Sequence, residues 1–165
     1  MSRAKPALLF VCLGNICRSP LAEAAFAAEA KRIGLEVEID SAGTGDWHIG
    51  RPPDPRAIAV AVRNGSDIAE LKARQVSPDD FNRFDHIVAL DQKNLADLIR
   101  MRPPDGTAAV SLLLDHVEGR SGQAVADPYY GHDTHFDQAW ADVVAGAEGL
   151  ARHLVTTRDG ATPGK

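Results

Sequence analysis

The stretch ALLFVCLGNICRSPLAE, residues 7–23, decides the fold. Its first five residues form an apolar run of strand length, which is typical of a strand buried on both faces of a sheet. Gly14 and Asn15 predict a tight turn after this run, because both residue types tolerate left-handed backbone conformations. Ser19 and Pro20 are typical of an N-cap and of the first helical position. A strand, a tight turn and a helix in this order predict the opening of an α/β fold.

The rest of the chain repeats this alternation. We expect one three-layer, Rossmann-like α/β domain over residues 1–157, in which a central four-stranded parallel sheet carries helices on both faces. Residues 158–165 are expected to form a flexible tail. In such a fold the ligand site lies at the carboxyl ends of the strands. The expected strands are residues 7–11, 36–40, 84–90 and 108–114, the expected helices are 19–33, 55–63, 92–101 and 134–155, and the longest loops are 41–54 and 115–133.

Composition and charge exclude several classes of function. With 18 basic and 23 acidic residues among 165, the chain has a net charge of −5 and lacks the basic excess of a nucleic-acid-binding surface. No apolar run approaches the roughly 20 residues that span a bilayer, and the N-terminal run lacks the pattern of a signal peptide. Two cysteines, Cys12 and Cys17, cannot build a disulfide framework, so we expect a reduced, cytoplasmic protein.

The loop between the first strand and the first helix has the chemistry of an anion site. Its backbone N–H groups and the positive end of the helix attract an anion, and Arg18 adds a planar fork of donors that matches phosphate oxygens. Cys12, at the end of the strand, would point into this cradle, where the helix dipole, Arg18 and the Ser19 hydroxyl favour its thiolate form. A thiolate beneath a bound phosphate is a nucleophile aimed at phosphorus.

The spacing of Cys12 and Arg18 is by itself weak evidence, because it fits equally well a buried cysteine that merely ends a core strand. The position of the pair between a buried strand and a Ser-Pro helix start favours the phosphate site. Other phosphate-binding loops fit poorly, since the segment has neither a Walker sequence nor a three-glycine dinucleotide fingerprint.

Residues 12–20 resemble the signature of the low-molecular-weight protein tyrosine phosphatases. A larger tyrosine phosphatase family shares the Cys-x5-Arg spacing but has a histidine and a glycine where this chain has Val11 and Asn15, so that family is disfavoured. The resemblance continues in order through Ser41-Ala42-Gly43-Thr44, Asp46-Trp47, residues 50–56, Ala73-Arg74-Gln75-Val76, Asp91 with Asn94-Leu95, and residues 127–131.

The resemblance implies a phosphatase I-like fold and a mechanism that needs no metal and no cofactor. It implies that Cys12 attacks the phosphoryl group to form a cysteinyl-phosphate, and that Arg18 binds the phosphate oxygens. The resemblance also implies that Asp127 is the general acid. Pro128 fits this role, because it keeps Asp127 out of helical geometry and on a loop. The residues alone also allow an ordinary Asp-Pro turn at this position.

The resemblance also assigns the surroundings of these residues. Ser19 would hydrogen-bond the thiolate, Asn15 would hold the strained loop, and Ser41 would support Asn15. The aromatic walls of the cleft would hold the phenyl ring of a substrate, whereas Trp140, in a helical pattern, is expected in the core. The phosphate-binding and supporting residues are thus Leu13, Gly14, Asn15, Ile16, Cys17, Ser19 and Ser41, and the cleft residues are Trp47, His48, Tyr129 and Tyr130.

Two departures from the family's pattern are expected to leave the chemistry unchanged. Many members have a histidine where this chain has Leu71, and His48 occupies a variable cleft position that is expected to alter substrate preference.

Related enzymes with a pair such as Cys12 and Cys17 form a reversible disulfide that protects the nucleophile from over-oxidation. The alternative is that Cys17 is a small residue that packs the loop.

Other polar clusters are interpreted as structural. Residues 132–137 offer possible metal ligands but lie at a helix entrance, where Asp and Thr serve as caps, so no metal site is predicted. His86 is expected to be a structural histidine on a strand. Lys72 and Arg74 are expected to be a solvated surface pair.

The predicted function is hydrolysis of phosphotyrosine in proteins, and of small aryl phosphates, with inorganic phosphate as product. We expect no nucleic-acid or membrane partner, and a monomer or weak dimer. The alternatives are a protein arginine phosphatase, in which a threonine would stand where this chain has Ile16, and a non-catalytic phosphate-binding module, which would have no use for Cys12 and Asp127. A thioredoxin-coupled arsenate reductase would need further cysteines, and this chain has only two.

Overall fold

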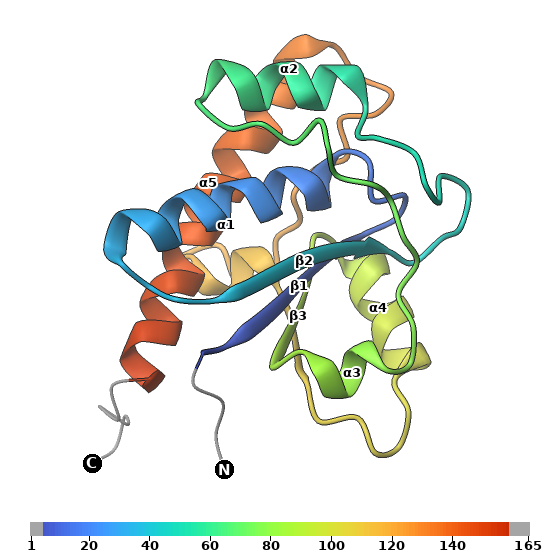
Figure 1. Ribbon diagram of the computed structural model, residues 1–165, viewed down its shortest axis with the longest axis vertical. Helices are drawn as coiled ribbons and strands as arrows, with labels where there is room; N and C mark the ends of the chain where they lie inside the picture. The colour runs from blue at the N-terminus through green and yellow to red at the C-terminus, as the bar shows by residue number, and fades with distance from the viewer. Residues whose placement is uncertain (1–4, 159–165) are drawn as a thin grey trace.

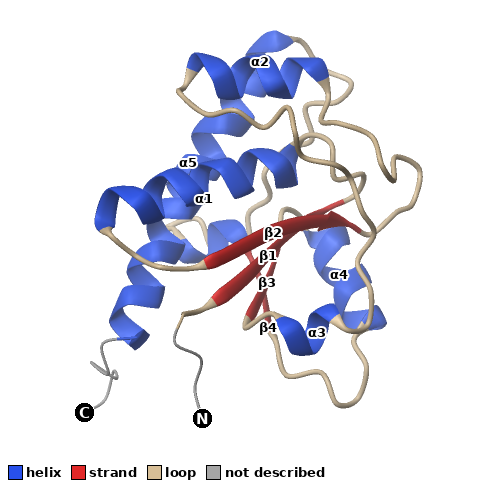
Figure 2. Cartoon of the chain, viewed as in Figure 1, coloured by secondary structure: helices blue, strands red, loops and turns tan. Residues whose placement is uncertain are grey.

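The computed structural model describes residues 5–158 as a three-layer α/β fold, and the expected fold class is confirmed (Figures 1 and 2). All strand pairs are parallel, and the sheet has the order β2-β1-β3-β4. The strands are β1 (Ala7–Cys12), β2 (Glu38–Gly43), β3 (His86–Ala89) and β4 (Ala109–Leu112). The helices are α1 (Arg18–Ile33), α2 (Pro55–Arg63), α3 (Asp80–Arg83), α4 (Gln92–Met101), the 3-10 helix η1 (Leu113–His116) and α5 (Asp133–Arg158).

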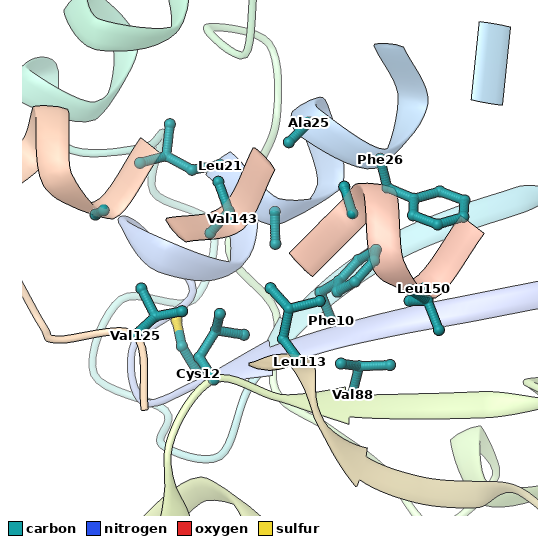
Figure 3. Packing of buried hydrophobic residues seen from close by; sticks show 14 of the residues in the cluster. Phe10, Cys12, Leu21, Ala25, Phe26, Val88, Leu113, Val125, Val143 and Leu150 are labelled. Atoms are coloured by element: carbon teal, nitrogen blue, oxygen red, sulfur yellow. The ribbon is translucent and has the colours of Figure 1, made fainter. Parts of the chain in front are cut away.

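Strand β1 is buried along its whole length because it lies inside the sheet and both of its faces are covered. Figure 1 shows α1 and α5 on one side of the sheet and α3 and α4 on the other. Leu8 and Phe10 belong to the core beneath α1 and α5, where Phe10 meets Phe26 with ring centroids 5.9 Å apart (Figure 3). Leu9 and Val11 belong to the core on the opposite face. The alternation places Cys12 at the end of β1, on the side of α1 and α5.

Several element boundaries differ from the expected ones. The strand expected over residues 36–40 runs instead over Glu38–Gly43, because the small residues Ser41–Gly43, which show no alternating pattern, continue the pairing with Phe10–Cys12. The helices α3 and η1 were not predicted, since four residues are too few to show helical periodicity. Helix α5 extends to Arg158, the first residue of the expected tail. The rest of that tail, residues 159–165, lies outside the described residues.

No helix within residues 5–158 combines the length and the apolar character that a bilayer span requires.

Candidate active site

A cavity of about 420 Å³ opens at the carboxyl end of β1, where the phosphate loop (residues 12–18) leads into α1. The structure brings the sequence-predicted residues together around it, although they come from three separate segments of the chain. Asn15, Ser19 and Ser41 do not line the cavity and lie buried behind it. The lining residues are Cys12, Leu13, Gly14, Ile16, Cys17, Arg18, Trp47, His48, Asp127, Tyr129 and Tyr130.

The sulfur of Cys12 lies in a field of hydrogen-bond donors. Ser19 Oγ is 3.0 Å from Cys12 Sγ, and the backbone N–H of Asn15 donates to the same sulfur over 3.3 Å. Helix α1 begins at Arg18, so its positive end also faces this region. Each of these contacts favours negative charge on the sulfur, which is the form that acts as a nucleophile.

Asn15 fixes the shape of the phosphate loop. It has a left-handed φ of 59°, a conformation that asparagine tolerates better than most residues, and its side chain is buried. Its Oδ1 accepts a hydrogen bond from the Arg74 N–H at 3.0 Å, so its Nδ2 must face Ser19 and Ser41, at 2.8 and 3.0 Å. Because Ser19 Oγ accepts from Asn15, its own hydrogen is available to Cys12.

A carboxyl group extends this hydrogen-bond chain at its far end. Ser41 Oγ donates to Glu23 Oε1 over 2.7 Å. Burial raises the pKa of Glu23, and the hydrogen bond from Ser41 opposes this effect. The sequence did not single out Glu23, because its contact with Ser41 depends on the pairing of β1 with β2.

The expectation that Arg74 is a solvated surface residue was wrong. Its guanidinium is about two-thirds buried and forms ion pairs with Asp40 at 3.1 Å and with Asp80 at 3.0 Å. Its backbone carbonyl accepts from the Gly43 N–H at 2.8 Å, which attaches this segment to the end of β2. These contacts hold the Arg74 N–H where it meets Asn15.

Arg18 is held at one edge of the cavity with a side-chain exposure of only 3%. Its Nη1 donates to Asp91 Oδ2 at 2.8 Å and to the Val125 carbonyl at 2.9 Å, while Nη2 lies 3.6 Å from Asp127 Oδ2. Burial alone would lower the pKa of Arg18, but the Cys12 sulfur, Asp91 and Asp127 raise it, so the guanidinium remains charged. No role was assigned to Asp91 from the sequence. A carboxylate directly after a buried strand, at the edge of the sheet where ligands bind, is the sequence signal that could have identified it as a site residue.

Asp127 and the two tyrosines lie on one tight turn at the mouth of the cavity. Asp127 is 42% exposed, and its Oδ1 accepts a hydrogen bond from the Tyr129 N–H at 3.1 Å. The rings of Tyr129 and Tyr130 meet edge to face at 4.8 Å. Tyr130 and, across the loop after β2, Trp47 are exposed to 93% and 68%, so their rings are free to contact a substrate.

His48 lies against the phosphate loop, next to Gly14. A Cβ on Gly14 would lie 2.8 Å from His48 Cδ2, which is closer than side chains pack. The His48 ring also lies 6.5 Å from the ring of Tyr129. His48 therefore bridges the two sides of the cavity.

Cys17 is a buried thiol that lines the same cavity as Cys12. Burial raises the pKa of Cys17 well above its ordinary value, and Asp54 and Cys12 add to this effect, so the group stays protonated. Both cysteines are free thiols in the structure.

The histidines and the tryptophan outside the cavity make the following contacts. The His132 N–H donates to His135 Nδ1 at 2.8 Å, at the start of α5. His86 is partly buried, and its ring meets that of His153 at 6.0 Å. Trp140 is also partly buried and packs against the core beneath α1 and α5.

The sequence matches a known protein family over nearly its whole length. The family described as low molecular weight phosphotyrosine protein phosphatase matches residues 7–159. The Schizosaccharomyces pombe protein of that name is 44% identical over 140 residues, which cover 83% of this chain and 89% of that protein. The low molecular weight protein-tyrosine-phosphatase YfkJ of Bacillus subtilis is 43% identical over 145 residues, which cover 87% of this chain and 92% of that protein.

Solved structures agree with the sequence comparison. The crystal structure of YfkJ superimposes with a TM-score of 0.87 at 39% identity, covering 95% of this chain and 99% of that one. A Drosophila arginine phosphatase superimposes with a TM-score of 0.83 at 30% identity, covering 88% of this chain and 96% of that one. On the strength of the family match and of these relatives, the chain belongs to the low molecular weight phosphotyrosine protein phosphatase family.

Proposed function

We propose that this protein hydrolyses phosphotyrosine in proteins, and small aryl phosphates, through a cysteinyl-phosphate intermediate. The observation that carries the proposal is the position of Cys12 Sγ beside the Ser19 hydroxyl and the Asn15 N–H, in a cavity that Arg18 and Asp127 also line. A site that only bound phosphate would gain nothing from an activated sulfur, so this geometry disfavours a non-catalytic binding module.

In the first step the Cys12 thiolate attacks phosphorus and an S–P bond forms as the P–O bond to the leaving group breaks. The leaving oxygen takes a proton from the carboxylic acid form of Asp127. The transferred group carries charge on its equatorial oxygens, and the Arg18 guanidinium and the N–H groups of the phosphate loop stabilise that charge.

In the second step a water molecule attacks the phosphorus of the cysteinyl-phosphate. The Asp127 carboxylate accepts a proton from the water, the S–P bond breaks, and Cys12 leaves as a thiolate stabilised by Ser19 and Asn15. Inorganic phosphate is the product, and Asp127 is protonated again for the next substrate.

The walls of the cavity support an aryl phosphate as substrate. Trp47, Tyr129 and Tyr130 present aromatic surface at its mouth, which suits the ring of phosphotyrosine. Ile16 adds apolar surface to the lining, where the arginine phosphatases of this fold are expected to carry a threonine. Because a Drosophila arginine phosphatase shares the fold, phosphoarginine is the alternative substrate to compare.

The decisive experiment measures hydrolysis of phosphotyrosine and phosphoarginine peptides in excess chelator, with the wild type beside Cys12→Ser. We expect the wild type to prefer phosphotyrosine and, with ³²P-labelled substrate, to yield a covalently ³²P-labelled enzyme in samples quenched rapidly with denaturant, and Cys12→Ser to do neither. Equal residual rates for the two proteins would eliminate the covalent mechanism. Faster hydrolysis of phosphoarginine would show that phosphoarginine, and not phosphotyrosine, is the preferred substrate.

Asp127→Ala tests the general acid separately. We expect it to slow phenyl phosphate by about 10²–10⁴-fold and to slow 2,4-dinitrophenyl phosphate far less, because dinitrophenolate leaves without a proton. A uniform loss on both substrates would remove Asp127 from the general-acid role.

We also propose that Cys17 protects the nucleophile under oxidation. Peroxide converts the Cys12 thiolate to a sulfenic acid, the Cys17 thiol attacks that sulfur, and a disulfide forms as water leaves. The two cysteines line the same cavity, which supports this step. If a peroxide-treated Cys17→Ser variant recovers with added thiol as fully as the wild type, Cys17 has no protective role.

We propose, finally, a cytoplasmic setting and a phosphatase domain over residues 1–157 that acts as a monomer or weak dimer. The need for a reduced Cys12 thiol supports the reducing compartment. Sedimentation of the full chain measures the oligomeric state, and fractionation of cells measures the location.

A further inference from the structure

Arg56, which the mechanism above does not use, contacts the turn that carries the general acid. We call residues 127–131 the acid loop. Arg56 Nη2 donates to the Tyr129 carbonyl at 2.8 Å, and Nη1 donates to the Gly131 carbonyl at 3.2 Å. The guanidinium also lies over the ring of Phe136, 4.6 Å from its centroid, and 5.8 Å from that of Tyr129. One side chain thus holds the acid loop at two carbonyl groups and one ring.

Asp54 holds the same guanidinium from the side of the phosphate loop. Its Oδ1 and Oδ2 accept from Arg56 Nε and Nη2 at 3.1 and 3.0 Å, and its side chain is only 9% exposed. Burial alone would raise the pKa of Asp54, but the hydrogen bonds from Arg56 lower it, so the pair is ionised. The Asp54 N–H donates to the Ile16 carbonyl at 2.8 Å, which attaches the pair to the phosphate loop.

The peptide groups of Tyr129 connect Arg56 to the general acid. The carbonyl of Tyr129 accepts from Arg56, and its N–H donates to Asp127 Oδ1 at 3.1 Å. The Gly131 N–H closes the turn by donating to the Pro128 carbonyl at 2.8 Å. A shift of the Tyr129 backbone would therefore move the hydrogen bond that orients the Asp127 carboxyl group.

We propose that Arg56, held by Asp54, is a positioning residue that fixes the Tyr129 backbone and so aims Asp127 at the leaving oxygen of the substrate. The proposal rests on the proposed role of Asp127 as general acid. Arg56 lines no part of the cavity and acts only through the acid loop, so we expect its largest effect on the step in which Asp127 protonates the leaving group.

The test compares Arg56→Met, which retains an unbranched stem without donors, with Arg63→Met on the same helix. Arg63 is the matched control because it also joins α2 to α5, through Asp137 at 2.7 Å, but contacts no part of the acid loop. We expect Arg56→Met to lower kcat/KM for phenyl phosphate by about tenfold, a fraction of the roughly 10²–10⁴-fold that a general acid contributes. For 2,4-dinitrophenyl phosphate we expect less than about a twofold loss, and Arg63→Met should change neither value beyond about twofold.

A double variant distinguishes positioning from a general loss of structure. In the Asp127→Ala background, Arg56→Met should cost nothing further on phenyl phosphate, because the group that it orients is already absent. Equal losses on both substrates, or a further loss in the Asp127→Ala background, would overturn the positioning role. If Arg56→Met does not fold, Arg56→Lys replaces it, and the same pair of substrates decides.

The two proposals fail differently. If Asp127→Ala slows both substrates equally, the general-acid assignment is wrong whatever Arg56 does. If Asp127→Ala is selective for phenyl phosphate and Arg56→Met is not, only the role of Arg56 is wrong.

Discussion

Asn15 offers a prediction in which strain and hydrogen bonding can be separated. Asn15→Ala and Asn15→Gly both remove the side chain that contacts Arg74, Ser19 and Ser41. They differ in backbone preference, because at a φ of 59° glycine is unstrained and alanine is not.

The magnitudes follow from these contacts. At about 0.5–1.5 kcal/mol for each net hydrogen bond, the loss of three bonds lowers the free energy of unfolding by about 1.5–4.5 kcal/mol in both variants. Alanine in the left-handed conformation costs a further 1–2 kcal/mol, roughly. We therefore expect Asn15→Gly to be more stable than Asn15→Ala by about 1–2 kcal/mol.

Urea unfolding of both variants, followed by fluorescence, measures these differences. The control is Asn64→Ala at the end of α2, where a φ of −107° is unstrained and a single hydrogen bond to the Val60 carbonyl is lost. The control should lose about 1 kcal/mol or less. Equal stabilities for Asn15→Ala and Asn15→Gly would show that the loop is not strained at this position, and the argument from φ would be refuted.

Three further predictions concern stability. Burial, and then His153, lower the pKa of His86 and His116 below 6.5, so the stability that the neutral rings contribute is present above this pH and falls on acidification. The fall is at most about 1.4 kcal/mol per pH unit and histidine. Denaturant titrations at two pH values should show a smaller fall for His116→Gln than for the wild type. Burial raises the pKa of Glu23 above 4.5, so the contribution of this group to the free energy of unfolding is favourable below that pH and is lost as the pH rises. At pH 7 Glu23→Gln should therefore unfold at a higher urea concentration than the wild type, and the difference between the two proteins should disappear near pH 4.5. Gly149→Ala should lower the melting temperature, because the added Cβ would lie 2.0 Å from the His116 carbonyl oxygen. This clash should outweigh the roughly 1 kcal/mol by which alanine favours a helix over glycine. A higher melting temperature would contradict this packing.

The local part of the active site could be predicted because its residues are neighbours in sequence. Residues 12–19 carry the proposed nucleophile, arginine and supporting serine within one strand–turn–helix unit, and each element has a sequence signal, although the helix begins at Arg18 with Cys17 rather than Ser19 at its N-cap. Asp127 was predicted only through the family resemblance, since no local pattern distinguishes it from other aspartates. The structure places it 3.6 Å from Arg18, a contact between segments more than 100 residues apart.

The contacts that hold the site together could not be predicted, because they depend on how distant segments pack. Arg18 meets Asp91 across 73 residues, and Arg56 meets Tyr129 across the same separation. Arg74 was misassigned for this reason, as its ion pairs form only once Asp40 and Asp80 are brought to the same edge of the sheet. Charge patterns along the chain do not show such pairs.

A common principle connects these contacts: the phosphate loop and the acid loop are each fixed to another segment by a guanidinium group. Arg18 joins the phosphate loop to Asp91 and to the Val125 carbonyl, and Arg56 joins Asp54 to the acid loop. Each guanidinium donates in two or more directions from one rigid plane, whereas an ammonium group is a single point that cannot fix a loop in orientation. Of the 18 basic residues, 13 are arginine, which suits a net-acidic protein whose site needs fixed geometry more than it needs positive potential. Substituting lysine at Arg18 or Arg56 should therefore preserve charge and still lose catalytic geometry.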